Sequence, residues 1–225
     1  MRTLNTSTTK QLNNLIEFRQ TAYDQILTGS RDIQFELTDA LLMGEAIGCF
    51  AELSLRPLFR RGWSSAYRAI AEGKQAARWL RHSFVQQVPR TGIQVYALDT
   101  TMWVHPKALP KYSIVQGHQY SMLTWTPEAG RSWSLTINNE RVEPEQNVIE
   151  VGLKQVETLC LARFDPLPRL LDVIVADGHY GNHHFFGGLK ALAWAGLARL
   201  RRDRVLYGPP PAYGGRGRPA YASSL

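Results

Sequence analysis

The sequence has few cysteines and no long apolar run, and each shortage excludes a class of protein. Its two cysteines, Cys49 and Cys160, lie far apart without a CxxC pair, which excludes a disulfide scaffold. We expect both to be reduced core residues of a cytoplasmic protein. The most apolar stretch, residues 187–198, is interrupted by Lys190 and is shorter than the roughly 18 residues of a membrane span. The first ten residues contain no apolar segment, so we expect no secretory signal.

Positive charge is in surplus and is concentrated in two blocks. The 225 residues include 26 Lys and Arg against 19 Asp and Glu, a net charge of +7. Residues 56–90 contain eight basic residues and one acidic residue, and residues 199–218 contain six and one. Two basic blocks on an otherwise acidic chain indicate a polyanionic partner, most simply DNA or RNA. The alternative is that these charges are solvated faces of helices.

The first part of the chain has the period of amphipathic helices. Between residues 11 and 89, apolar residues recur at spacings of three and four, interrupted by Gly and Pro. The first apolar face comprises Leu12, Leu15 and Ile16. We therefore expect residues 1–90 to form an all-helical, DNA-binding module. On its last helix, Arg78 and Arg81 lie in a basic stripe opposite an apolar face.

From residue 91 the pattern changes to β-branched and aromatic runs bounded by Pro, Gly and Asn. The expected strands are 93–100, 120–126, 132–138, 170–176 and 197–200, and the expected helices are 145–163 and 182–194. Three strands followed by helix, strand, helix and strand indicate a mixed sheet with flanking helices, an α+β or α/β fold. We expect this core to span residues 91–207, followed by a basic tail rich in Pro and Gly at 208–225.

Two aspartates follow apolar runs of this core. Asp99 ends the first strand, and Asp177 ends the strand that reads as buried on both faces. Carboxylates at the ends of central strands lie at the rim of a sheet, where α/β folds place their sites. Such a pair is suited to Mg²⁺ or Mn²⁺ and to the two-metal cleavage of phosphodiesters. The alternative is that Asp99 is a turn residue and Asp177 the N-cap of the next helix.

Ordered motifs in both halves resemble one family of bacterial insertion-sequence transposases, which have a DDE catalytic core of the ribonuclease H-like fold. The motifs are FELTDA (35–40), FAELS (50–54), LDTTMW (98–103), GHQYS (117–121), Glu140-Arg141, DGHYG (177–181), RLR (199–201), LYGPP (206–210) and GRGRP (215–219). The resemblance covers nearly the whole chain. It implies a helical module followed by an incomplete ribonuclease H-like core.

The resemblance also implies roles for the two aspartates. Asp99 and Asp177 match the first two acids of a triad whose third member is a glutamate on a later helix. No glutamate follows Asp177 in this sequence, and residues 220–225 depart from the family pattern. We therefore expect the front part of a transposase, shortened by a frameshift or a premature stop. The absent third acid leaves the enzyme activity of the chain open.

By this resemblance, the function is DNA transposition through metal-dependent strand cleavage and transfer, with Mg²⁺ or Mn²⁺ held by Asp99 and Asp177. The expected partner is double-stranded DNA of the transposon ends, in the nucleoid of a bacterial cytoplasm, with no membrane and no nucleotide. A homodimer is left open. The residues assigned to DNA are Arg78, Arg81, Arg199, Arg201, Arg216 and Arg218. The alternatives are an inactive DNA-binding remnant that inhibits an intact copy, and a two-carboxylate nuclease unrelated to transposition.

Three other patterns suggest sites that we do not expect. The histidines at 179, 183 and 184 resemble a zinc site, but Gly181 intervenes and the glutamate of a zinc protease motif is absent. The glycine pairs at 187–188 and 214–215 lack the strand and lysine of a phosphate-binding loop. The six tryptophans are expected in the core or an interface, and the alternative is that they are platforms on which bases stack.

Overall fold

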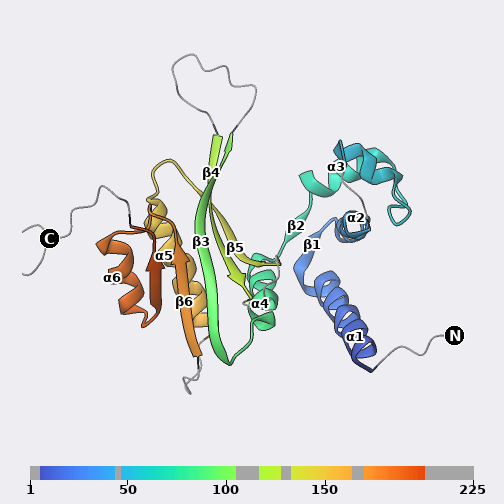
Figure 1. Ribbon diagram of the computed structural model, residues 1–225. Helices are drawn as coiled ribbons and strands as arrows, with labels where there is room; N and C mark the ends of the chain where they lie inside the picture. Colours follow the sequence, from blue (N-terminus) through green and yellow to red (C-terminus); the bar gives the residue numbers. More distant parts are fainter. Residues whose placement is uncertain (1–5, 44–46, 105–116, 128–132, 164–169, 201–225) are drawn as a thin grey trace, which may run out of the picture. The chain divides into compact units, whose positions relative to one another are not determined.

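The chain folds into two compact units, Met1–Gln87 and Val88–Leu225. The computed structural model describes residues 6–43, 47–104, 117–127, 133–163 and 170–200 (Figure 1). The division falls close to the expected boundary at residue 90. No helix in the described ranges has both the length and the apolar character to cross a membrane.

The first unit is mainly helical. Its α-helices are α1 (Thr6–Thr21), α2 (Arg31–Leu42), α3 (Trp63–Ala71) and α4 (Ala77–Gln87), with η1 (Ala22–Ile26) and η2 (Phe50–Leu55) between them. It also contains a short antiparallel pair, β1 (Leu27–Gly29) and β2 (Lys74–Gln75). The expectation of an all-helical module was wrong at this pair, because strands of three and two residues are too short to show a period of two.

The core of this unit lies between α2, η2 and α3. Ile33, Leu37 and Ala40 of α2 are buried, as their spacing predicts. Leu53, Phe59, Ala66 and Ala69 complete this cluster. In contrast, Leu12, Leu15 and Ile16 of α1 are 45%, 52% and 55% exposed. Helical periodicity identifies an apolar face of α1 but not the partner that covers it.

Glu36 is a buried carboxylate that binds two arginines of the first basic block. Its side chain is 10% exposed and faces the guanidinium groups of Arg60 and Arg61, each at 3.3 Å. It also accepts a hydrogen bond from the backbone N–H of Arg60 at 3.2 Å. A desolvated carboxylate needs such partners to offset the cost of burial. One buried carboxylate thus offsets part of the charge of these two arginines, although the Arg60 side chain remains 80% exposed.

The second unit contains a five-stranded mixed sheet. Its strands are β3 (Gly92–Val104), β4 (Gly117–Thr126), β5 (Leu135–Val142), β6 (Leu170–Ala176) and β7 (Ala195–Ala198). They lie in the order β5-β4-β3-β6-β7, where β3, β6 and β7 are parallel and the β5-β4 and β4-β3 pairs are antiparallel. The helices α5 (Val148–Arg163) and α6 (His183–Ala191) connect β5 to β6 and β6 to β7. This order confirms the expected ribonuclease H-like fold.

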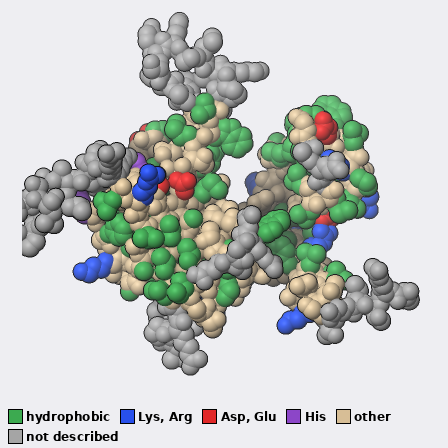
Figure 2. All heavy atoms as spheres, viewed as in Figure 1, with side chains coloured by type: hydrophobic (Ala, Val, Ile, Leu, Met, Phe, Trp, Pro, Cys, Tyr) green, Lys and Arg blue, Asp and Glu red, His purple; other side chains and the backbone are tan. Residues whose placement is uncertain are grey.

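Both helices cover the same face of the sheet (Figure 1). Alternate residues of β3, Gln94, Tyr96 and Leu98, are buried on that face. The other face carries Ile93 and Leu171, which are paired across β3 and β6 and are 51% and 49% exposed. Figure 2 shows hydrophobic side chains gathered over β3 and β6 on this open face.

The expectation that both cysteines lie in the core was wrong. Cys49 is exposed, because the chain there is extended and precedes η2 instead of continuing a helix. Cys160 is half-buried. Four of the six tryptophans are at least half exposed, so a place in the core is wrong for them and a place in an interface stays a prediction: Trp63, Trp79, Trp103 and Trp133.

A buried ion pair fixes the start of the second unit. The side chains of Arg163, at the end of α5, and Asp172, in β6, are 3% and 11% exposed and lie 3.3 Å apart. Arg163 also donates to the backbone oxygens of Val88 and Pro89 at 3.5 and 3.0 Å. One guanidinium thus ties a helix, a strand and the segment that enters β3.

Replacing Asp172 by Ala leaves the Arg163 charge buried without its carboxylate. We expect a loss of about 3–5 kcal/mol in the free energy of unfolding, measured by urea titration of circular dichroism. The matched control is Glu143→Ala, which removes an exposed carboxylate 3.5 Å from Arg141 and should cost less than about 0.5 kcal/mol. Equal urea midpoints for the two variants would contradict this account.

Candidate active site at the edge of the sheet

The register of the three parallel strands brings two acidic residues and one basic residue into one row across the sheet. Leu98 of β3 is paired with Ala176 of β6, which is paired with Ala198 of β7. The next residues along these strands are Asp99, Asp177 and Arg199. Neighbouring strands are about 4.8 Å apart, so the three residues form a row that crosses β3 at Asp99 and passes the carboxyl ends of β6 and β7. The backbone N–H of Arg199 donates to the carbonyl of Ala176 at 3.3 Å, which fixes the end of the row.

Asp99 lies within a strand and not in a turn. β3 continues to Val104, beyond the expected end at residue 100, and Asp99 is paired with Met122 of β4. The carboxylate is exposed, and its Oδ1 accepts the backbone N–H of Thr100 at 2.7 Å. Pairing with β4 beyond the end of β6 holds the backbone of Asp99 rigid while its side chain stays accessible.

Asp177 is the first residue after β6 and is also exposed. Its Oδ1 accepts the backbone N–H of His179 at 2.9 Å. The N-cap of α6 is Asn182, whose Oδ1 accepts the N–H of Phe185 at 3.0 Å. The N-cap interpretation of Asp177 is therefore wrong, and no hydrogen bond to a described residue occupies its Oδ2 or that of Asp99.

A buried polar cluster lies beneath the two carboxylates. The Tyr180 hydroxyl is 3.5 Å from the Oγ of Ser121, which donates to the Oε1 of Gln155 at 2.6 Å. Gln155 in turn donates from Nε2 to the carbonyl of Ser121 at 3.0 Å. Burial raises the pKa of Tyr180, and the charges of Asp177 and Asp99 raise it further. Both carboxylates therefore act on this hydroxyl, which stays protonated at neutral pH.

Sequence reasoning missed most of this cluster. Tyr180 and Ser121 lie in motifs that carried the family resemblance, but nothing in those motifs indicates that the two side chains meet. Gln155 gave a weaker signal, as a polar residue on the otherwise apolar inner face of α5. All three are fully or nearly fully buried, and Gln155 is 2% exposed.

Gly152 allows α5 to approach Tyr180 closely. A Cβ at this position would lie 2.9 Å from Cε1 of Tyr180 and 3.0 Å from Cδ2 of Leu98. Real Cβ atoms are not found that close to a fixed neighbour, so any side chain here must displace the ring or the strand. The glycine thus sets the depth at which Tyr180 lies under the aspartates.

Gly152→Ala should cost about 1–3 kcal/mol of stability, because the methyl group overpacks the contact with Tyr180 and Leu98. Gly187→Ala is the matched control, since Gly187 is also helical and a Cβ there meets nothing within 4 Å. The control should gain about 0.5–1 kcal/mol from the lower entropy of the unfolded chain. Thermal unfolding of both variants measures the difference, and a stabilised Gly152→Ala would contradict the close packing of Tyr180.

The described residues contain no cluster that completes a metal site around the two aspartates. In the described part of the chain, no three His, Cys, Asp or Glu side chains lie together as a metal site. Glu140 follows Asn139, which is paired with Met122 in the row of Asp99. Alternation along β5 therefore turns Glu140 to the face opposite Asp99.

The residues assigned to DNA are only partly described. Arg78 is exposed and Arg81 half-buried on α4, and neither has an ion pair with a described residue. Arg199 is exposed at the edge beside Asp177. Arg201, Arg216 and Arg218 lie outside the described residues.

Comparison with known proteins identifies a family. The family model described as "DDE superfamily endonuclease" matches residues 113–225, half of the chain. No curated protein matches the sequence.

Two solved structures are similar over 76% of this chain. The crystal structure of the Mos1 strand transfer complex has 15% identity and a TM-score of 0.30, and 59% of that chain is covered. A pre-cleavage Mos1 transpososome has 14% identity and a TM-score of 0.29, and 60% of that chain is covered. This chain thus spans about three fifths of the length of either.

Proposed function

Because the chain belongs to the DDE superfamily endonucleases, we propose that it is part of a DNA transposase that cleaves and transfers strands at transposon ends. In this proposal, Asp99 and Asp177 are two of the ligands of the divalent metal ions on which the superfamily generally depends. The observation that supports it is the row formed by Asp99 within β3, Asp177 directly after β6 and Arg199 directly after β7.

The two aspartates suit a hard divalent cation such as Mg²⁺ or Mn²⁺. Both carboxylates are exposed, and in each only Oδ1 accepts a hydrogen bond from a described residue. Mg²⁺ prefers oxygen ligands and takes only one or two carboxylates, which leaves positions for water and phosphate oxygens. Metal ions bound here would activate water and stabilise the leaving oxygen of a phosphodiester.

The residues around the aspartates position the site and the DNA. Pairing of β3 with β4 fixes Asp99, and the His179 N–H orients Asp177. The guanidinium of Arg199 is suited to hold a backbone phosphate of the strand, because its planar fork donates two parallel hydrogen bonds. In the first unit, Arg78 and Arg81, which form no ion pair with a described residue, supply positive charge for phosphates elsewhere on the duplex.

Metal binding is testable without any reaction. Two carboxylates on neighbouring strands repel each other, and a shared cation relieves that repulsion. At a concentration 100 times its Kd, Mn²⁺ should stabilise the wild-type chain by about 2.7 kcal/mol, measured as a rise in Tm.

The rise in Tm should be much smaller in Asp99→Asn and in Asp177→Asn. Glu157→Gln is the control, since it removes an exposed carboxylate on α5 and should respond as the wild type does. If Asp99→Asn responds to Mn²⁺ as fully as the control does, Asp99 is not a ligand.

DNA binding by α4 should depend on salt. Reversing Arg78 and Arg81 to Glu should weaken binding to any duplex and lower the log–log salt slope by about 0.9 for each phosphate that is no longer neutralised. Arg68→Gln is the control, because Arg68 already faces Glu72 at 3.0 Å. Unchanged affinity of the double variant in a salt titration would exclude α4 from the DNA interface.

An inactive DNA-binding remnant is the second candidate, and the number of carboxylates favours it. Among the described residues, no third acidic side chain joins Asp99 and Asp177. A misplacement of about 1 Å at a reacting centre costs about 10²-fold in rate. The loss of a whole metal ligand should cost more than that, so two carboxylates alone make a poor catalytic site. On this alternative, residues 1–225 bind DNA but do not cut it at a useful rate. Mn²⁺-dependent nicking that is lost in Asp177→Ala would exclude the alternative.

A further inference from the structure

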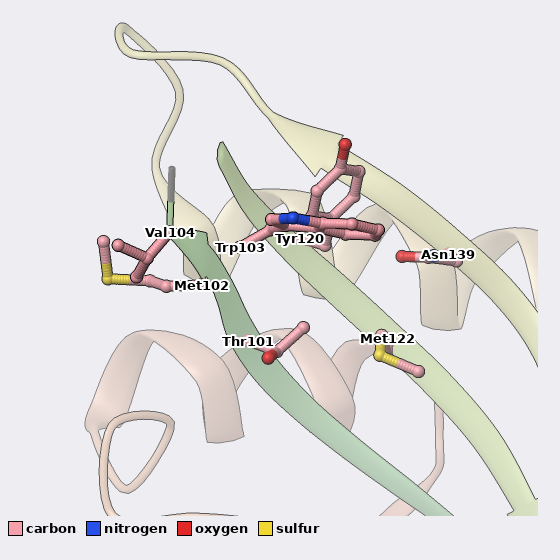
Figure 3. A pocket seen from close by; sticks show the side chains of 7 residues that line it. All are labelled: Thr101, Met102, Trp103, Val104, Tyr120, Met122 and Asn139. Atoms are coloured by element: carbon pink, nitrogen blue, oxygen red, sulfur yellow. The ribbon is translucent and has the colours of Figure 1, made fainter. Parts of the chain in front are cut away.

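A pocket opens on the sheet next to Asp99. Its volume is about 630 Å³, and the side chains that line it come from β3, β4 and β5 (Figure 3). Those used below are Thr101, Trp103, Tyr120, Met122 and Asn139. The pocket size is within the range of about 300–1,000 Å³ that is typical of small-molecule sites.

The pocket lies on the same face of the sheet as the Asp99 carboxylate. Asp99, Thr101 and Trp103 alternate along β3, so their side chains share one face. Across the sheet, Thr101 is paired with Tyr120, and Asp99 with Met122. At about 3.3 Å per residue, Trp103 is roughly 13 Å along the strand from Asp99, the length of about four stacked nucleotides.

The described lining is uncharged, and two of its seven residues are aromatic; Met102 and Val104, which alternation places on the other face of β3, also border the pocket (Figure 3). It presents the indole of Trp103 and the phenol of Tyr120 beside the thioether of Met122, with the Asn139 amide and the Thr101 hydroxyl as polar groups. Figure 3 shows both aromatic rings on the same side of β3. No Lys, Arg, Asp or Glu is among the described residues that line the pocket. It therefore fits a flat, neutral group with hydrogen-bonding edges better than it fits a phosphate.

Trp103 is 70% exposed, so its ring is open to a ligand. An exposed indole has lost little water and gains stacking energy when a planar ring covers it. Stacking of a nucleobase on an aromatic side chain is worth roughly 1–3 kcal/mol and tolerates any base, because every base has a π face.

We propose that this pocket binds an unpaired nucleobase of the DNA strand whose backbone passes Asp99. The inference rests on the proposed function, since it takes the Asp99 edge as the place where a strand lies. A base inside a duplex is stacked and paired, so the ligand is a base in a single-stranded end or one turned out of the duplex. The pocket would thereby hold the strand in register with the two aspartates.

The test measures DNA affinity without metal, so that nothing is cut. The probes are a short oligothymidylate, the same length of strand made of abasic sites, and a blunt duplex. Trp103→Ala should bind the oligothymidylate about tenfold more weakly, and Trp103→Phe should retain most of the affinity. For the wild type, abasic sites should have the same effect as Trp103→Ala. Trp133→Ala is the control, because Trp133 is 82% exposed but does not line the pocket.

The outcomes separate this inference from the proposed function. Equal affinity of the Trp103→Ala and Trp133→Ala variants for the oligothymidylate would overturn the base pocket, while salt-dependent duplex binding through Arg78 and Arg81 would keep the proposed function. A change of oligomeric state in Trp103→Ala with unchanged DNA affinity would also overturn the pocket, since the occupant would then be a second copy of the chain. Absence of binding to every probe would overturn both proposals.

Discussion

The parallel pairing of β3, β6 and β7 is the constraint on which the rest of the site depends. It aligns Leu98, Ala176 and Ala198, so the residues that follow them emerge side by side. A shift of one residue in either pair would send the side chains to opposite faces. The buried residues on the helix-covered face, such as Tyr96 and Ile174, oppose that shift because it would expose them.

The side-chain packing beneath Asp99 and Asp177 also holds this part of the sheet in place. Gly152 lets α5 approach until Tyr180 is fully buried, and Ser121 and Gln155 satisfy the polar groups that this burial brings together. A buried hydroxyl without a partner would cost roughly 1–3 kcal/mol. The close packing of Tyr180 against α5 therefore depends on the polar partners that Ser121 and Gln155 provide. Near the amino end of β6, the Arg163–Asp172 ion pair also fixes the backbone, since it links α5 and β6 to the segment that begins the unit.

The sequence predicted what depends on local pattern. The almost wholly apolar run at 170–176 predicted β6 with its observed bounds, and the aspartates that follow the apolar stretches of β3 and β6 predicted where the candidate site lies. It could not predict contacts between residues that are far apart in the sequence. Arg60 and Arg61 read as free basic residues because Glu36, which binds them, lies 24 and 25 positions away. Periodicity placed Leu12 on an apolar helix face but does not show whether that face is covered, and nothing in the sequence indicates that Gln155 contacts Ser121.

The central claim is that the carboxylates of Asp99 and Asp177 bind metal at one shared site. The most direct measurement is a Mn²⁺ titration of the wild type, the two single Asn variants and the double variant, followed by electron paramagnetic resonance of the unbound ion. If the carboxylates share the site, either single change removes most of the affinity and the double variant binds hardly more weakly than the singles. Losses in the logarithm of the affinity that add independently, or a double variant that binds Mn²⁺ as the wild type does, would contradict the claim.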